Sequence, residues 1–169
     1  LKNLLLLSDI PVFDILTPRT VIFSLSEDST VEEFFHMHDD VRFSRIPIYK
    51  ENEPENISGF VLRSDLLLAQ SRGNTDTCLS NYTRPLQAIL ETTSVAKALE
   101  EFIKINTQMM LVIDEYGGVE GLLTLEDLLE TLLGAEIVDE GDKAIDMQKL
   151  AKRFAKKRED RAKDFYEKE

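Results

Sequence analysis

The chain has 169 residues, a length that suits one large domain or two small ones. Hydrophobic residues make up 43% of it, so a net charge of −12 does not make it a disordered chain. The acidic balance disfavours nucleic acid as a partner, and the single cysteine, Cys78, excludes an internal disulfide. The apolar run at residues 4–7 is far too short to cross a bilayer. We therefore expect a soluble fragment of a longer protein, in a reducing compartment.

The first half of the chain predicts the order strand, helix, strand, strand, helix. Ser29 followed three residues later by Glu32 predicts a capping box that opens the first of these helices. Apolar runs on either side of a polar loop predict the strand pair. The predicted elements after a helical lead-in at 1–19 are a strand at 20–24, a helix from Ser29, strands at 46–49 and 57–62, and a helix at 63–69.

The second half predicts the same order after a polar linker at 70–81. Residues 114–118 carry two consecutive glycines and fit a hairpin turn better than a phosphate-binding loop. The predicted elements are a strand at 86–90, a helix at 94–105, strands at 109–113 and 119–124, and a helix at 125–132.

The two halves also repeat each other in sequence. Residues 59–67 resemble residues 121–129 at an offset of 62, and Pro18 corresponds to Pro85 at an offset of 67. Each repeat has about sixty residues, which is too few to bury a large core alone. We expect an α+β fold in which two βαββα repeats pack through their sheets, with a helix flanking each end.

The C-terminal segment differs in composition from the rest. Residues 143–169 hold ten Lys and Arg against six Asp and Glu. Met147, Leu150 and Phe154 recur at helical spacing, which predicts one long, mostly solvated helix. It could pack on the body of the protein, on a partner, or near an anionic membrane surface.

No constellation in the sequence points to catalysis. His36 and His38 are two residues apart on a predicted helix, so they point in different directions and are interpreted as ordinary surface histidines. Cys78 lies in the polar linker and is interpreted as a residue without a functional role, not as a nucleophile. We predict that the chain is not an enzyme and that it has no catalytic residues and no protein metal centre.

The abundant carboxylates allow a weaker metal hypothesis. Glu126 and Glu130 share a helix face, and a hard cation such as Mg²⁺ prefers oxygen ligands. A solvated acidic surface is the favoured interpretation, and a nucleotide-free divalent-cation sensor is the rival. The other acidic residues that this rival would use are Asp39, Asp40, Asp139, Glu140 and Asp142.

Thr124 and Asp127 form the most informative local motif, because they directly follow a predicted strand. One interpretation is a capping box, in which each side chain accepts a hydrogen bond from the other residue's backbone amide. The other is a nucleotide site, in which the helix N-terminus faces a phosphate and the aspartate accepts the ribose hydroxyls. The first repeat has Asp65 at the equivalent position, which adds weight to the second interpretation.

Four longer strings give the sequence a specific resemblance. They resemble the tandem cystathionine-β-synthase (CBS) domains, or Bateman module, of the CorC/CNNM family of magnesium and cobalt transport proteins. The strings occur in the family's order and extend over most of the chain. They are residues 15–19 (ILTPR), 43–49 (FSRIPIY), 112–118 (VIDEYGG) and 121–130 (GLLTLEDLLE).

This resemblance implies a regulatory module that binds an adenine nucleotide, AMP or ATP, with or without Mg²⁺, between the two repeats. The bland alternative makes Phe43 and Ile46 core residues, Pro47 a strand-edge residue and Arg45 a surface ion pair. The implied binding set places the adenine against Phe43, Ile46 and Pro47, the phosphates near Thr17, Arg45 and Thr124, and the ribose on Asp127, and it includes Leu122.

The first repeat departs from this pattern. In the pseudo-equivalent site, Leu62 occupies the position that corresponds to Thr124, and Arg84 occupies the position that corresponds to Thr17. Asp65 is retained at the position that corresponds to Asp127. These changes predict at most a weaker second site at Asp65 and Arg84, so one site per chain is favoured.

The resemblance also implies partners and a location. A membrane-spanning domain of the same parent chain would place this module at the cytoplasmic face of the membrane, where it would control a magnesium or cobalt transporter. We expect a homodimer formed through helix faces that include Leu128, Leu129 and Leu132. A dimerisation scaffold whose basic tail binds a partner is a further alternative. The expected segments are 1–19, repeat 1 at 20–69, a linker at 70–81, repeat 2 at 82–133, and an acidic turn with a basic helix at 134–169.

Overall fold

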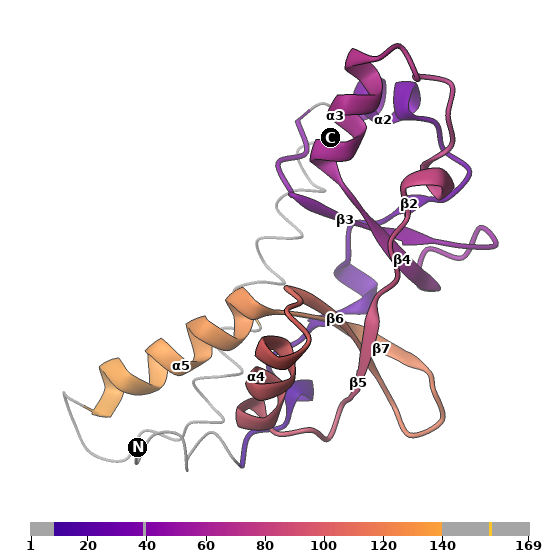
Figure 1. The fold of residues 1–169 in the computed structure, drawn as a ribbon. Helices are drawn as coiled ribbons and strands as arrows, with labels where there is room; N and C mark the ends of the chain where they lie inside the picture. The colour runs from indigo at the N-terminus through magenta and orange to yellow at the C-terminus, as the bar shows by residue number, and fades with distance from the viewer. Residues whose placement is uncertain (1–8, 39, 140–155, 157–169) are drawn as a thin grey trace. The chain divides into compact units, whose positions relative to one another are not determined.

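The computed structural model describes residues 9–38, 40–139 and 156, which form two α+β units (Figure 1). We call residues 23–86 the continuous unit, and residues 1–22 together with 87–169 the split unit. Of the N-terminal helical segment expected at 1–19, the structure describes residues 9–19, which form 3-10 turns and a two-residue strand at Thr17–Pro18. The basic helix expected near the C-terminus lies outside the described residues apart from Lys156.

The continuous unit contains a three-stranded sheet in the order β2-β3-β4. β2 runs parallel to β3, and β3 runs antiparallel to β4. Ile46 and Ile48 of β3 and Val61 of β4 are fully buried, as are Phe34 of α2 and Leu66 of α3. The elements are β2 (Leu25–Ser26), α2 (Val31–Met37), β3 (Arg45–Tyr49), β4 (Ile57–Leu62), α3 (Arg63–Ser71) and a 3-10 turn at Leu79–Tyr82.

The split unit contains a four-stranded sheet in the order β1-β7-β6-β5. β5 is parallel to β6, while β6 and β1 are both antiparallel to β7. The elements are 3-10 turns at Val12–Asp14 and Arg19–Val21, β1 (Thr17–Pro18), β5 (Gln87–Leu90), α4 (Val95–Lys104), β6 (Met109–Ile113), β7 (Val119–Thr124) and α5 (Leu125–Asp139).

The core of the split unit joins its helices to its sheet. Ser94 caps α4 by accepting a hydrogen bond from the backbone N–H of Lys97 at 3.3 Å. The apolar residues of α4 recur at i, i+3 and i+7, which places them on one buried face. The residues that form this core include Ile10, Val12, Ile15 and Leu16 from the lead-in, Val95, Ala98 and Phe102 from α4, Met110 and Val112 from β6, Leu123 from β7 and Leu128 from α5.

Three expectations about the elements were wrong. The expected strand at 20–24 is absent, because Arg19–Val21 forms a 3-10 turn and the strand is Leu25–Ser26. The first capping box lies one residue later than expected. The Thr30 hydroxyl accepts from the Glu33 backbone, and the Glu33 carboxylate accepts from the Thr30 backbone. The last helix also continues beyond residue 132, to Asp139.

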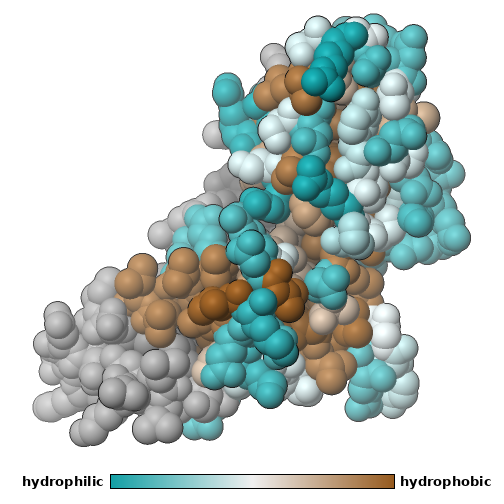
Figure 2. Space-filling model, viewed as in Figure 1, coloured by the Kyte–Doolittle hydropathy of each residue, from teal (hydrophilic) through white to brown (hydrophobic). Residues whose placement is uncertain are grey.

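The expected interface role of Leu128 was wrong as well. Leu128 belongs to the core of the split unit, so it is not available to a second chain, and Leu132 is only partly exposed. Leu129 and Leu133 are the exposed leucines of this helix, with 42% and 54% of their surface accessible. Hydrophobic side chains gather over α5 in Figure 2.

Candidate functional site

The lead-in strand β1 places Thr17 in the sheet of the split unit. Thr17 pairs with Leu122 and Pro18 pairs with Gly121 of β7. A Cβ atom at Gly121 would collide with the backbone oxygen of Thr17, so only glycine permits this close approach. The pairing brings Thr17 beside a strand that ends at Thr124.

Thr124 and Asp127 form a reciprocal capping box where β7 leads into α5. The backbone N–H of Asp127 donates to Thr124 Oγ1 at 3.2 Å, and the backbone N–H of Thr124 donates to Asp127 Oδ2 at 2.9 Å. Asp127 is only 4% exposed. The capping interpretation is therefore confirmed. We call Thr17, Leu122, Thr124 and Asp127 the Asp127 corner.

The continuous unit has an equivalent arrangement, which we call the Asp65 corner: Phe60, Leu62, Asp65 and Arg84. The backbone of Arg84 bridges Phe60, as that of Thr17 bridges Leu122. A Cβ atom at Gly59 would approach the Arg84 backbone oxygen to 2.5 Å, so this close approach also requires a glycine. The register confirms that Arg84 takes the structural place of Thr17.

The two corners differ in what their carboxylates bind. Leu62 has no hydroxyl, and α3 begins without a side-chain cap. Asp65 instead accepts a hydrogen bond from Arg84 Nη2 at 2.7 Å. The Arg84 and Asp65 side chains are 51% and 31% exposed, so solvent screens this ion pair.

The adenine-side residues of the expected set lie in β3 and just before it. Phe43 is 48% exposed, and its ring centroid lies 6.3 Å from that of Phe23. Arg45 is partly buried and pairs with Leu62, whereas Ile46 is fully buried. The bland interpretation thus holds for Ile46 as a core residue but not for the exposed Phe43.

Pro47 is buried within the central strand of the three-stranded sheet. A proline interrupts a central strand because it has no N–H to donate. Here β2 pairs only with Ile48 and Tyr49, so the missing N–H of Pro47 removes no hydrogen bond to β2.

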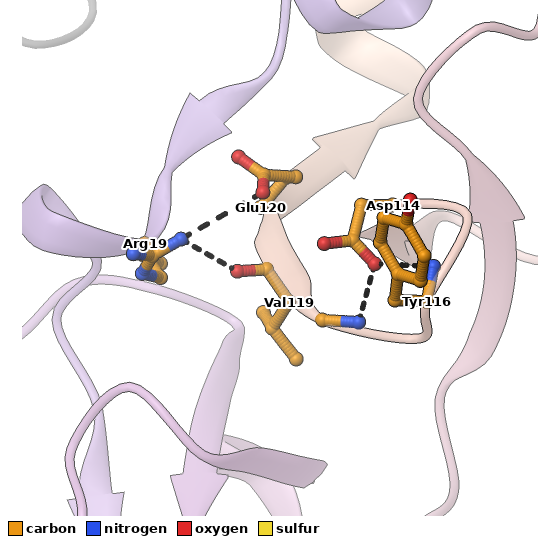
Figure 3. Close-up of polar contacts among 6 residues, drawn as sticks. Arg19, Asp114, Tyr116, Val119 and Glu120 are labelled. Carbon is orange, nitrogen blue, oxygen red and sulfur yellow. Dashed lines mark hydrogen bonds and ion pairs between the residues drawn. The ribbon is translucent and has the colours of Figure 1, made fainter.

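A polar contact between Arg19 and β7 was not singled out from the sequence. Arg19 Nη1 donates to the backbone oxygen of Val119 at 3.0 Å and lies 3.8 Å from Glu120 Oε1 (Figure 3). Its position directly after Thr17-Pro18 in the first family string was the available signal.

The turn between β6 and β7 is held by Asp114. Its Oδ1 accepts from the backbone N–H groups of Tyr116 and Gly118 at 2.8 and 2.7 Å, which closes the expected hairpin turn (Figure 3). Gly117 has a positive φ of 86°, as this turn requires.

The histidines and acidic residues form no metal centre in the described part of the chain. Within residues 9–38, 40–139 and 156, no three His, Cys, Asp or Glu side chains are arranged to hold an ion. His36 is exposed, but His38 is half buried, and its ring lies 5.3 Å from that of Phe23. His38 was therefore wrongly interpreted as a surface residue. Asp39, Glu140 and Asp142 of the acidic set lie outside the described residues.

Two further observations concern the linker and the membrane. Cys78 is partly buried and bridges Thr30 through the backbone. Among the helices that the structure describes, none has both the length and the apolar content needed to span a bilayer.

Comparison with known proteins identifies the family. The CBS domain family matches residues 11–72 and 79–134. The UPF0053 protein sll1254 of Synechocystis sp. is 39% identical over 147 residues, which are 87% of this chain and 42% of that protein. The magnesium and cobalt efflux protein CorC of Escherichia coli K12 is 32% identical over 154 residues, which are 90% of this chain and 52% of CorC.

A solved structure agrees with this assignment. The CBS domain of a bacterial CNNM/CorC family Mg²⁺ transporter, in complex with ATP, is 30% identical with a TM-score of 0.71 and covers 79% of this chain and 94% of that one. The chain spans about half the length of the curated relatives it matches. The expectation of a non-enzymatic regulatory module is confirmed by this family assignment. The chain belongs to the CBS domain family, as a tandem pair related to the CBS modules of CorC/CNNM magnesium transporters.

Proposed function

We propose that this CBS pair binds an adenine nucleotide and thereby regulates a magnesium or cobalt transporter to which it is attached. The observation that carries the proposal is the Asp127 corner, where β1–β7 pairing sets Thr17 beside the strand that presents Thr124 and Asp127. The related CBS domain that was solved in complex with ATP supports the choice of ligand.

The proposed binding residues have distinct chemical roles. At the start of α5, Thr124 offers a hydroxyl and the helix N-terminus carries a partial positive charge, both suited to a phosphate. Asp127 supplies acceptors for the ribose hydroxyls. Arg45 can donate two parallel hydrogen bonds to phosphate oxygens, and Phe43 offers an exposed aromatic face to a purine.

The remaining members of the proposed set are Thr17 and three apolar residues. Thr17 contributes a second hydroxyl from β1. Leu122, Ile46 and Pro47 are buried in the free protein, so we assign them to the walls that hold the polar residues in position. Mg²⁺ is proposed only as a companion of the nucleotide phosphates.

The proposal extends to the assembly in which the module works. It includes a homodimer, a membrane-spanning domain of the parent chain, and a position at the cytoplasmic face of the membrane. In this arrangement the nucleotide would act as a signal, because binding without turnover changes the stability of the module that it occupies.

Isothermal titration calorimetry with ATP and AMP tests the binding site. Asp127→Asn is the sharpest variant, because asparagine keeps an oxygen acceptor for the Thr124 amide and removes the charge. The loss of a charge-assisted hydrogen bond should weaken nucleotide binding more than tenfold, or roughly 1.5–3 kcal/mol. Asp65→Asn is the matched control and should change affinity much less.

The proposed site would be contradicted if the two variants had the opposite effects on nucleotide binding. If Asp65→Asn abolished binding while Asp127→Asn bound like the wild type, the proposed residues would be wrong. A thermal shift caused by Mg²⁺ alone, unchanged in both variants, would instead support the rival cation sensor.

A further inference from the structure

The Asp65 corner reproduces the backbone of the Asp127 corner, but not its side chains. In both corners a backbone segment, at Thr17 in one and at Arg84 in the other, approaches a glycine of a strand, and we call each a lead-in segment. The helix that follows the strand carries an aspartate at its third position. At the lead-in position one corner has Thr17 and the other has Arg84. This exchange puts a long cation where the Asp127 corner has a short hydroxyl side chain.

The Arg84 guanidinium binds the Asp65 carboxylate, which would otherwise accept the ribose hydroxyls of a nucleotide. Arg84 Nη2 is 2.7 Å from Asp65 Oδ2. A ribose hydroxyl is a neutral donor, whereas the Arg84 guanidinium adds the attraction of a full positive charge to its hydrogen bond with the carboxylate. Leu62 further removes the hydroxyl that Thr124 supplies in the other corner.

We propose that Arg84 closes the Asp65 corner to nucleotides, so that each chain binds one adenine nucleotide. This inference rests on the proposed function, since it specifies how many nucleotides that function uses. Arg84 is then a specificity-determining residue that acts by occupying Asp65 and the space beside it.

The backbone of the Asp65 corner does not depend on this side chain. The backbone N–H of Phe60 donates to the Arg84 oxygen at 3.0 Å, and the backbone N–H of Arg84 donates to the Phe60 oxygen at 2.7 Å. The ion pair itself is half exposed and therefore adds little to stability. Replacement of Arg84 should leave the lead-in segment in place and open the corner.

The test transfers the side chains of the Asp127 corner to the Asp65 corner. Calorimetry with ATP gives the number of nucleotides bound per chain in the wild type, in Arg84→Thr/Leu62→Thr, and in that double variant with Asp65→Asn added. We expect one nucleotide, two nucleotides and one nucleotide, respectively. Circular dichroism checks the fold, and if the double variant does not fold, Arg84→Thr alone should reveal a second, weaker binding event.

Each other outcome has a defined meaning. One nucleotide in both the wild type and a folded double variant would overturn the inference and leave the proposed function standing. Two nucleotides in the wild type, one of them lost in Arg84→Thr, would show that Arg84 binds nucleotide rather than excludes it. No nucleotide in the wild type but one in the double variant would support closure by Arg84 and refute the Asp127 site. No binding to either would refute both proposals.

Discussion

The Thr124–Asp127 capping box has a structural role that can be separated from ligand binding. Thr124→Ala removes the acceptor for the Asp127 backbone N–H, so unfolding in urea should show a loss of about 1 kcal/mol. Thr30→Ala removes the matching acceptor for Glu33 in α2 and should cost a similar amount. Only Thr124→Ala should also weaken ATP binding. Equal nucleotide affinity in both variants would restrict Thr124 to capping.

Gly121 is the residue that admits β1 to the sheet of the split unit. In Gly121→Ala the new methyl group would collide with the Thr17 backbone, which cannot move as a side chain can. We expect a loss of roughly 2–4 kcal/mol in unfolding free energy. Gly73→Ala is the control, because its methyl group meets open space and only the positive φ of 77° is strained, at about 1 kcal/mol. Similar losses in both variants would argue against the steric explanation.

At the scale of elements, the β6–β7 hairpin depends on the Asp114 turn. Asp114→Ala removes the acceptor for two backbone N–H groups, while Asp114→Asn keeps an oxygen at the same place. Because these amides are near solvent, we expect a loss on the order of 1 kcal/mol for alanine and less than half of that for asparagine. Thermal unfolding measures both. If Asp114→Asn lost as much stability as Asp114→Ala, the charge of Asp114 would matter more than its hydrogen bonds.

Several elements could be predicted from the sequence to the residue. β6 and β7 match the expected ranges, because β6 is a continuous apolar run that ends before a turn and β7 ends at the capping residue Thr124. β2 could not be predicted, since a two-residue strand has no periodicity and exists only through its pairing with β3. The β-branched run at 20–22 was a misleading signal. There a 3-10 turn follows Pro18, and the Arg19 side chain is tied to Val119.

For the whole molecule, we predict a homodimer that uses α5. Burying a charged group without a partner costs far more than exposing a leucine. Leu129→Glu/Leu133→Glu should therefore convert the dimer to a monomer in sedimentation experiments. Ile103→Glu, on the exposed face of α4, is the control and should leave the dimer intact. A wild-type monomer at micromolar concentration, with and without ATP, would refute the dimer.

The sequence by itself determined the repeat, the order of the elements and the capping motif at Thr124, because these depend on local spacing and on similarity between the two halves. Only the tertiary structure decided which sheet each lead-in segment joins. The Arg19–Val119 hydrogen bond spans 100 residues, and no local pattern encodes such a contact.

The tertiary structure also decided the state of the two aspartates at equivalent positions. Asp127 is buried in its own capping box, while Asp65 is bound by Arg84. The sequence placed both aspartates at the start of a helix and offered a capping box for Asp127, but it did not pair Asp65 with Arg84. The partner of a carboxylate depends on which donors the backbone brings within about 3 Å, and long-range strand pairing brought Arg84 within that distance of Asp65.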